Sequence, residues 1–435
     1  MSKTIIIIGA GLAGLSAALQ AAENGCNVKL VSSLPSERAQ SVMAEGGINA
    51  ALNTKDENDS PEEHFTDTIK AACGLADPNA VWGMTQAAPE LVHWLLKLGV
   101  KFNMSGYDDV DLRNFGGQKK KRTAFAQSDT GKQIMTAMID AVRRKEASGM
   151  VERVSHHSFL TLSLCGNICC GCVIRDEYSQ ETVELPGDAV IVATGGMHGL
   201  FGNTTGSLSN TGEVTAELFR LGVPLANGEM IQYHPTTVKC GGKRMLISEA
   251  ARGEGGRLFA MKDGKQWYFM EEKYPELGNL MPRDITAREI WKVSHESEVF
   301  LDMTEISEEI ISNKLSGLAD DCMTYLHKDI RKEPVSVLPG IHYFMGGILV
   351  DEQHRTPIQN LCAAGECCAQ YHGANRLGGN SLLGALYGGR VAAKSACEQA
   401  DVVDLSCATQ IDFPPASQIS EIKQLNKVMQ ETMGV

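Results

Sequence analysis

The sequence predicts an α/β fold in which helices cover a parallel β-sheet of the Rossmann type. Three segments are expected to be strands of that sheet: Ile5–Ile8, Asp188–Gly196 and Pro357–Glu366. The first is a continuous apolar run, which is typical of a strand buried on both faces. Helical stretches at Ala80–Leu98 and Lys132–Arg144 connect the strands. This alternation of strands and helices is the pattern of an open α/β domain.

The first predicted strand passes into a glycine-rich turn. Gly9, Gly11 and Gly14 follow it at G-x-G-x-x-G spacing, and a second strand is predicted at Asn27–Ser33. In such a turn the first glycine makes the bend, the second admits a pyrophosphate to the backbone, and the third lets the helix pack on the strand. The free N–H groups of the helix would hold the phosphates. A strand, a helix and a second strand in this order predict a dinucleotide site.

Two features near the N-terminus bear on that prediction. The second strand ends at Ser32 and Ser33, whereas many such folds place an Asp or Glu there to hold a ribose. Lys3 followed by the apolar stretch Ile5–Leu19 resembles a secretory signal. A signal needs no such glycine spacing, so we favour the dinucleotide site and expect both serines to contact the cofactor.

Composition narrows the class of protein. At 435 residues the chain is long enough for two or three domains, and 43% hydrophobic residues supply ample core. The formal net charge of −13 argues against a nucleic-acid partner, and the one dense basic run, Lys119–Arg122, is interpreted as a solvated loop. Apart from the N-terminal stretch, no apolar segment approaches the roughly 20 residues of a membrane helix, so we expect no direct membrane insertion. The 13 cysteines, an odd number, indicate reduced thiols and a cytoplasmic protein.

A cluster of cysteines near residue 170 raises the hypothesis of a metal or iron–sulfur site. However, Leu160–Ile174 and Thr182–Leu185 are predicted to be paired strands, with Asp176–Gln180 as the turn. Adjacent cysteines on a strand point to opposite faces, which makes a shared ion awkward. We therefore interpret them as small buried side chains and predict no metal site. The four are Cys165, Cys169, Cys170 and Cys172.

The chain changes character in its second half. Residues 226–342 are a mixture of loops, short strands and charged helices. We predict that this segment is an α+β domain inserted into a nucleotide-binding domain that spans residues 1–225 and 343–400. The remaining residues, 401–435, contain one amphipathic stretch, Ile419–Met433.

One stretch, His372–Leu382, suggests a carboxylate site. It places Arg376 among glycines, with Ser381 and Leu382 just beyond. Arginine is a planar fork of donors that stays charged, which suits bidentate capture of a carboxylate. Taken alone, such an arginine is more often part of a surface ion pair. A second glycine-rich element at the other end of the chain favours the carboxylate clamp.

Eight short motifs occur in one order along the chain, from residue 4 to about residue 400. Together they closely resemble the flavoprotein subunit of succinate dehydrogenase and fumarate reductase, whose family also holds L-aspartate oxidase. The motifs are Gly9–Gly14, Ala44–Gly47, Phe115–Gly117, Tyr233–Thr236, Ser248–Gly256, Pro282–Asp284, His342–Ile348 and His372–Leu382.

The resemblance implies an FAD cofactor on a Rossmann-like domain of the two-dinucleotide-binding flavoprotein type. It also implies that residues 226–342 cap the isoalloxazine ring and that a C4 dicarboxylate lies between cap and flavin. The residues expected to contact FAD are Gly9, Gly11, Gly14, Ser32, Ser33, Gln40, Ser41, Gly46, Gly47, Glu213, Glu366, Ser381 and Leu382.

The resemblance also implies roles for the polar motifs. Arg283 would deliver a proton to one alkene carbon while flavin N5 delivers hydride to the other, and Glu249 and Arg252 would relay protons to Arg283. The spacing of Glu249 and Arg252 leaves a plain ion pair on one helix face as the alternative. The side chains expected to hold or line the dicarboxylate are His234, Ser248, His342, Arg376 and Phe115.

Gln40 departs from the family pattern. Quinone-linked members usually carry a flavin-attached histidine where this chain has Gln40. An amide cannot form that bond, so we expect noncovalent FAD. The missing link would lower the flavin potential and favour fumarate reduction.

Phe115 is a second departure, because aspartate oxidases carry a glutamate near the substrate amine there. A phenyl ring cannot pair with an ammonium comparably, which favours a dicarboxylate without an amine. The nearby Gln118, Lys119 and Arg122 also resemble fumarate reductases. L-Aspartate oxidase, which would make iminoaspartate for NAD biosynthesis, stays open as the alternative.

The remaining departures concern flavin affinity and partners. Glu213 stands where the family has an aspartate followed by glycine, which predicts weaker FAD binding. The family's C-terminal helical domain is represented only by residues 401–435 and is expected to be truncated. That domain helps to seat an iron–sulfur electron-transfer subunit, so such a partner, holding the protein at the inner face of the membrane, is one prediction. An FAD-binding scaffold without activity is the third hypothesis.

Overall fold

The centre of the molecule is a five-stranded parallel sheet with the strand order β20-β10-β1-β2-β6. The structure, a computed structural model, describes residues 2–399, 428 and 429. β1 (Thr4–Ile8) lies between β10 (Ala189–Val192) and β2 (Asn27–Ser32). The edge strands are β20 (Leu361–Ala363) and β6 (Val151–Ser155). The predicted α/β fold class is confirmed.

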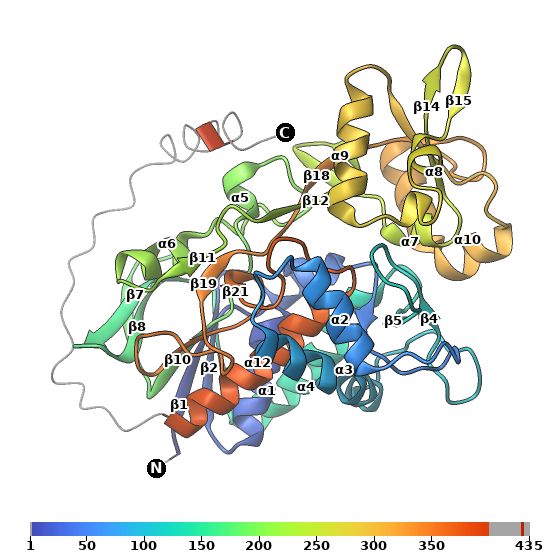
Figure 1. Cartoon of the computed structure of the whole chain (residues 1–435). Helices are drawn as coiled ribbons and strands as arrows, with labels where there is room; N and C mark the ends of the chain where they lie inside the picture. The colour runs from blue at the N-terminus through green and yellow to red at the C-terminus, as the bar shows by residue number, and fades with distance from the viewer. Residues whose placement is uncertain (1, 400–427, 430–435) are drawn as a thin grey trace.

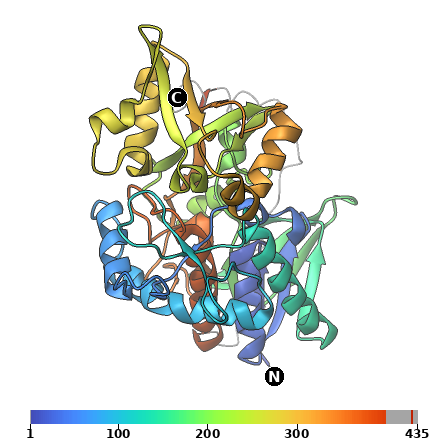
Figure 2. The same ribbon diagram turned by 90° about the vertical axis from the view of Figure 1, so that its right-hand side faces the viewer.

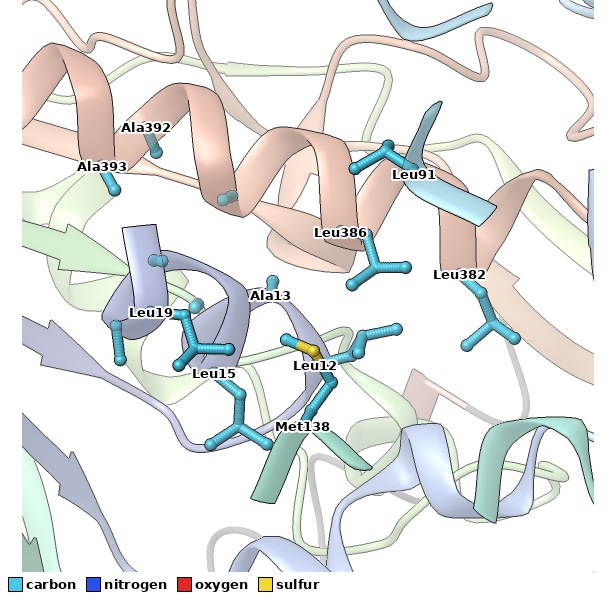
Figure 3. Close-up of a cluster of buried hydrophobic side chains, with 14 of the residues drawn as sticks. Leu12, Ala13, Leu15, Leu19, Leu91, Met138, Leu382, Leu386, Ala392 and Ala393 are labelled. Carbon is cyan, nitrogen blue, oxygen red and sulfur yellow. The ribbon is translucent and has the colours of Figure 1, made fainter. Parts of the chain in front are cut away.

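Helices cover one face of this sheet (Figure 1). The helix after the glycine turn, α1 (Leu12–Glu23), packs along α12 (Asn380–Gln399) and against α4 (Thr130–Ala147), and α3 (Pro78–Leu98) packs on α12. Figure 3 shows leucines of α1 and α12 gathered around Met138 of α4. The first and last helices of the described domain therefore share one hydrophobic core.

Successive side chains of β1 enter two different cores. Ile5 and Ile7 belong to the helix-side core, whereas Ile6 and Ile8 belong to a core shared with an antiparallel sheet on the opposite face. This two-sided burial explains why the segment is apolar at every position.

The antiparallel sheet differs from the prediction in one respect. Leu160–Ile174, expected to be a single strand, is divided into β7 (His157–Cys165) and β8 (Ile168–Asp176). The chain turns at Gly166, whose φ of +60° suits glycine. β9 (Thr182–Pro186) pairs with β8 as expected.

Three of the four cysteines predicted to be buried in this sheet pack in the interior, whereas Cys165, at the end of β7, is half-buried. Cys169, Cys170 and Cys172 are buried, and all three are free thiols. Burial raises the pKa of the Cys169 thiol to about 12. In the described part of the chain, no three His, Cys, Asp or Glu side chains converge in a way that could hold a metal ion.

Residues 226–342, called the capping segment below, lie beside the sheet-and-helix layers (Figure 2). Their buried side chains form a hydrophobic cluster, which Phe115 from outside the segment also joins. One of the segment's sheets faces the rest of the molecule, and a second sheet lies farther out. The inner sheet is β12 (Ile231–Cys240), β13 (Lys243–Leu246) and β18 (Leu338–Phe344); the outer sheet is β14 (Arg257–Lys262), β15 (Lys265–Trp267), β16 (Val299–Asp302) and β17 (Val335–Ser336). The helices are α7 (Glu249–Gly253), α8 (Phe269–Lys273), α9 (Arg283–Ser294), α10 (Glu308–Lys314) and α11 (Ser316–Asp321).

Short elements complete the fold. They are β3 (Ile48–Asn49), α2 (Pro61–Ala71), β4 (Leu112–Arg113), β5 (Thr123–Ala124), α5 (His198–Phe201), α6 (Glu213–Arg220), β11 (Leu225–Ala226), β19 (Gly347–Leu349) and β21 (Cys368–Ala369). None of the helices in the described residues is long and apolar enough to cross a membrane. The predicted helical remnant over residues 401–435 lies outside the described residues, except for 428 and 429.

Candidate active site

A cavity of about 700 Å³ extends from the glycine turn of the parallel sheet to the capping segment. Its lining brings together almost all of the predicted site residues. Gly14 and Arg252 do not line it, because Gly14 packs α1 against Gly9 and Arg252 pairs with Glu249 from α7. The predicted residues that line the cavity are Gly9, Gly11, Ser32, Ser33, Gln40, Ser41, Gly46, Gly47, Phe115, Glu213, His234, Ser248, Glu249, Arg283, His342, Glu366, Arg376, Ser381 and Leu382.

Three charged side chains form a buried chain at the capping end of the cavity. Arg283, the first residue of α9, donates from Nε to Glu249 Oε2 over 2.8 Å, and its second guanidinium nitrogen lies 2.6 Å from the same oxygen. Arg252 donates to Glu249 Oε1 over 3.1 Å. Of the three, only Arg283 and Glu249 reach the cavity. The arrangement joins a guanidinium in the cavity to one outside it through a single carboxylate.

The carboxylate in this chain is ionised. Burial alone would raise the pKa of Glu249, but the guanidiniums of Arg283 and Arg252 and their hydrogen bonds hold it below its ordinary value. The backbone N–H of Gly116 donates a further hydrogen bond to Glu249 Oε1 over 3.1 Å. Glu249 is placed by the short helix α7, which begins after Ser248; the Ser248 hydroxyl oxygen accepts from Ala250 N over 3.4 Å. Ser248 can therefore cap this helix and still donate its hydroxyl proton to a ligand.

Two histidines from neighbouring strands lie together at the same end. The rings of His234 on β12 and His342 on β18 are 5.0 Å apart. His234 Nδ1 lies 3.1 Å from Thr236 O, and His342 Nδ1 lies 2.8 Å from Thr205 Oγ1, so each ring is fixed through one nitrogen. Burial lowers the pKa of both rings well below the ordinary value, helped at His234 by Arg283 and at His342 by His234. Both rings are therefore neutral near pH 7.

Arg376 is the unusual charge of the site. Its side chain is 3% exposed, it has no salt bridge to a carboxylate among the described residues, and its Nε has no hydrogen-bond partner. The guanidinium carbon lies 4.3 Å from the centre of the Tyr343 ring. Burial and the nearby Arg283 lower the pKa of Arg376 to about 9. A buried cation without a counter-ion is costly, so this geometry favours an anionic ligand.

Comparison with known proteins places this geometry in a family. The family described as FAD binding domain matches residues 4–382. The succinate dehydrogenase flavoprotein subunit of Bacillus subtilis is 44% identical over 413 residues, which cover 93% of this chain and 70% of that protein. This chain belongs to the succinate dehydrogenase and fumarate reductase flavoprotein family. It is an FAD-dependent oxidoreductase of that type.

Relatives in this family carry different substrate names. L-aspartate oxidase of Streptomyces coelicolor is 34% identical over 406 residues, covering 90% of this chain and 68% of that protein. Among solved structures, E. coli quinol fumarate reductase FrdA superposes with a TM-score of 0.87 at 28% identity, covering 100% of this chain and 79% of that chain. Membership of the flavoprotein family therefore does not by itself choose the substrate.

The glycine turn fits the pyrophosphate of the family's cofactor. A Cβ on Gly9, where φ is +110°, would lie 2.3 Å from Ala193 O, and one on Gly14 would lie 1.8 Å from Gly9 O. Gly11, in contrast, faces open space, with Ala39 Cβ as its nearest neighbour at 3.8 Å. It begins α1 without a side-chain cap. The uncapped N–H groups of α1 therefore open onto the cavity, as a phosphate site requires.

Two carboxylates flank the same cavity farther along. Glu366 Oε1 accepts from His198 Nε2 and from Phe344 N, each over 3.0 Å. A carboxylate has several acceptor positions, so Glu366 can accept further hydrogen bonds from the cavity. Glu213 is exposed at the first position of α6, after Gly212 with a φ of +77°. Both carboxylates line the cavity.

Sequence reasoning missed three residues that organise the substrate end. Gln232 accepts from Arg283 over 3.1 Å and donates to Arg376 O over 2.7 Å, so it joins the two arginines. Tyr343 lies against Arg376, and Thr205 fixes His342. Strand periodicity could have indicated Gln232, because it precedes His234 by two positions and so lies on the same face of β12.

Proposed function

We propose that this flavoprotein interconverts fumarate and succinate, with noncovalent FAD and with fumarate reduction as the favoured direction. The observation that carries this proposal is Arg376, a buried guanidinium in the cavity without a carboxylate partner among the described residues. A dicarboxylate would supply its counter-ion. His342, His234 and Ser248 line the same end and would complete the grip on the two carboxylates.

Arg283 is the group that would move a proton. When bound, the flavin would supply hydride in its reduced form and would accept hydride in its oxidised form. Arg283 would donate its proton to the other alkene carbon, since its guanidinium reaches the cavity. Arginine stays protonated in proteins, so the proton must be replaced as it leaves. The 2.6 Å contact with Glu249 and the 3.1 Å contact from Glu249 to Arg252 support that replacement.

Replacing Arg283 tests the role of the acid. Arg283→Lys should lower fumarate reduction with a reduced dye by orders of magnitude, because the ammonium cannot keep the same two contacts with Glu249. Arg288→Lys is the matched control, since Arg288 lies on the same helix with a side chain that is 62% exposed. Near-normal activity in Arg283→Lys would mean that another group is the acid.

Gln40 supports noncovalent flavin. It lines the cavity, and an amide cannot form the flavin bond expected of a histidine. Acid precipitation should therefore release all flavin into the supernatant. A yellow pellet would show a covalent link and remove the argument for a lowered flavin potential.

Phe115 supports a substrate without an amine. The ring is 2% exposed and packs against Gly46 and Gly378, so no carboxylate occupies that position. L-Aspartate oxidation is the second candidate, because one relative carries that name. A side-by-side assay of fumarate, succinate and L-aspartate with FAD-loaded protein decides between them. Faster turnover of L-aspartate would overturn the fumarate assignment.

The domain and partner assignments belong to the same proposal. Residues 1–225 and 343–400 would bind FAD, and the capping segment, whose buried side chains form a hydrophobic cluster with Phe115, would close over it. Relatives are named as flavoprotein subunits, which supports the presence of a partner subunit. We propose that this partner is an iron–sulfur electron-transfer protein that holds the chain on the cytoplasmic side of a membrane. Purification of the native protein from membranes and from the soluble fraction, with iron analysis of each, tests this part.

A further inference from the structure

The turn that follows Arg376 forms part of the wall of the site. A Cβ placed on Gly378 would lie 2.9 Å from the Phe115 ring, 3.0 Å from Glu249 Oε2 and 3.3 Å from an Arg283 nitrogen. The turn backbone therefore packs directly against the proton-transfer residues. Any shift of this turn would move Arg376 relative to Arg283.

Two buried side-chain amides hold this turn. Asn49 Nδ2 and Gln118 Nε2 both donate to Gly378 O, each over 2.7 Å. The backbone N–H of Asn49 also donates to Gly379 O over 3.1 Å. Asn49 is fully buried on β3 and Gln118 is 4% exposed. Since both lone pairs of Gly378 O are engaged, its carbonyl direction is fixed from two sides.

The rest of the Asn49 amide is engaged as well. Asn49 Oδ1 accepts from Gln118 Nε2 over 3.1 Å and from Thr123 Oγ1 over 2.6 Å. Asn49 Nδ2 donates to Asn380 Oδ1 over 2.8 Å, and His64 Nε2 lies 2.9 Å from that oxygen. Burial and Arg122 lower the pKa of His64 to about 3, so its ring is neutral. Gln118 Oε1 and His64 Nδ1 have no hydrogen-bond partner among the described residues, whereas both ends of the Asn49 amide are engaged. The bonds that reach the Gly378 carbonyl are buried, and buried hydrogen bonds are costly to break.

Neither Asn49 nor Gln118 lines the cavity, so neither touches substrate or cofactor there. Their effect reaches the site through the turn that they hold. We propose that Asn49 and Gln118 are positioning residues that fix the Gly378–Gly379 turn, and with it Arg376, opposite Arg283. This inference rests on the proposed dicarboxylate site. According to this inference, the buried amides of Asn49 and Gln118 set the distance between Arg376, which binds the substrate, and Arg283, which protonates it.

Replacing Gln118 isolates the contact with the turn. Gln118→Met keeps the volume of the side chain and removes its hydrogen-bond donor. It should raise the KM for fumarate about 10- to 100-fold. It should weaken by the same factor the binding of malonate, a dicarboxylate that has no double bond to reduce. Gln20→Met is the control, because Gln20 is 6% exposed on α1 and bonds only Asn24 in its neighbourhood. Its KM and malonate affinity should be unchanged. FAD content is measured in parallel for all variants.

Gln118→Glu provides a test that loss of folding cannot imitate. A protonated glutamate can donate to Gly378 O, whereas an ionised one cannot. At each pH the malonate affinity of this variant is divided by that of the parent, which cancels the titration of malonate itself. The ratio should approach one at low pH and the value for Gln118→Met at high pH. A pH-independent ratio for Gln118→Glu, or an unchanged affinity in Gln118→Met, would overturn the positioning role.

The same measurements separate this inference from the proposed function. If the parent binds malonate but does not reduce fumarate, the proposed reaction fails, and the drop in affinity still tests the positioning role. If the parent reduces fumarate and the Gln118 variants keep its KM, the reaction stands and the positioning role fails.

Discussion

At the scale of single residues, Glu45 has a strongly shifted acidity. It belongs to the Ala44–Gly47 motif and lines the cavity, and its Oε2 is buried without a hydrogen-bond partner among the described residues. Burial, with Asp321 and Asp129, raises its pKa to about 8, and Arg113 opposes them only in part. Because the folded pKa is raised, the stability from this carboxyl is present below its ordinary value of about 4.5 and is lost as pH rises through about 8.

Glu45→Gln should remove that pH dependence. In the parent protein without flavin, we expect the free energy of unfolding to fall by a few kcal/mol between about pH 5 and about pH 9. The variant should keep most of its stability over that range, since an amide does not ionise. Urea unfolding at several pH values measures the effect. The exposed Glu37→Gln serves as control, and an equal pH slope in both variants would contradict the role of Glu45.

At the scale of elements, the contact between α1 and α12 leaves no room for a side chain. A Cβ on Gly389 of α12 would lie 2.3 Å from Ala13 O and 3.0 Å from Ser16 Cβ. Ser16 Oγ donates to Leu386 O over 2.7 Å, which fixes the two helices at this distance. The close approach lets α12 present Ser381 and Leu382 to the cavity.

Gly389→Ala should therefore destabilise the fold, although alanine is the better helix former. Forcing the helices apart typically costs about 1–3 kcal/mol. Gly242→Ala, at an open position with no atom within 4 Å, should change stability by less than about 0.5 kcal/mol. Urea unfolding of both variants is the measurement. Equal stability would mean that the α1–α12 contact adapts.

At the scale of the whole molecule, the cavity joins the capping segment to the sheet domain. His234 and Arg283 come from the first, and Arg376 comes from the second. A ligand that contacts both the capping segment and the sheet domain should therefore raise the free energy of unfolding of the two parts together. Ligand at 100 times its Kd adds about 2.7 kcal/mol, which raises the unfolding temperature.

Arg376→Met should separate the two ligands in thermal unfolding. The rise caused by FAD should persist, whereas the further rise caused by malonate should disappear, because only malonate depends on the clamp. Arg390→Met, which alters a cation that faces Trp94 on the far side of α12, should keep both. A malonate effect that survives in Arg376→Met would place the anion elsewhere.

The sequence predicted best those features that depend on near neighbours. Gly9, Gly11 and Gly14 were predictable because strand, turn and helix follow directly in the chain. The division of 160–174 into two strands was missed, because Gly166 alone marks a turn within an apolar stretch. Gln232 and Asn49 were missed because the backbone carbonyls that they hold, Arg376 O and Gly378 O, lie 144 and 329 residues away in the chain. Only the folded structure shows that these two amides contact the backbone of the segment that carries Arg376.

The order of the parallel sheet has a consequence for biosynthesis. β20, at residues 361–363, pairs with β10 and thereby with the first strand of the chain. Ribosomes add about 5–20 residues per second, so the first glycine turn waits tens of seconds or less for this strand. Through that interval α1 has no α12 to cover it. Because Ser381 and Leu382 of α12 line the cavity, we expect flavin to load after the ribosome has delivered that helix.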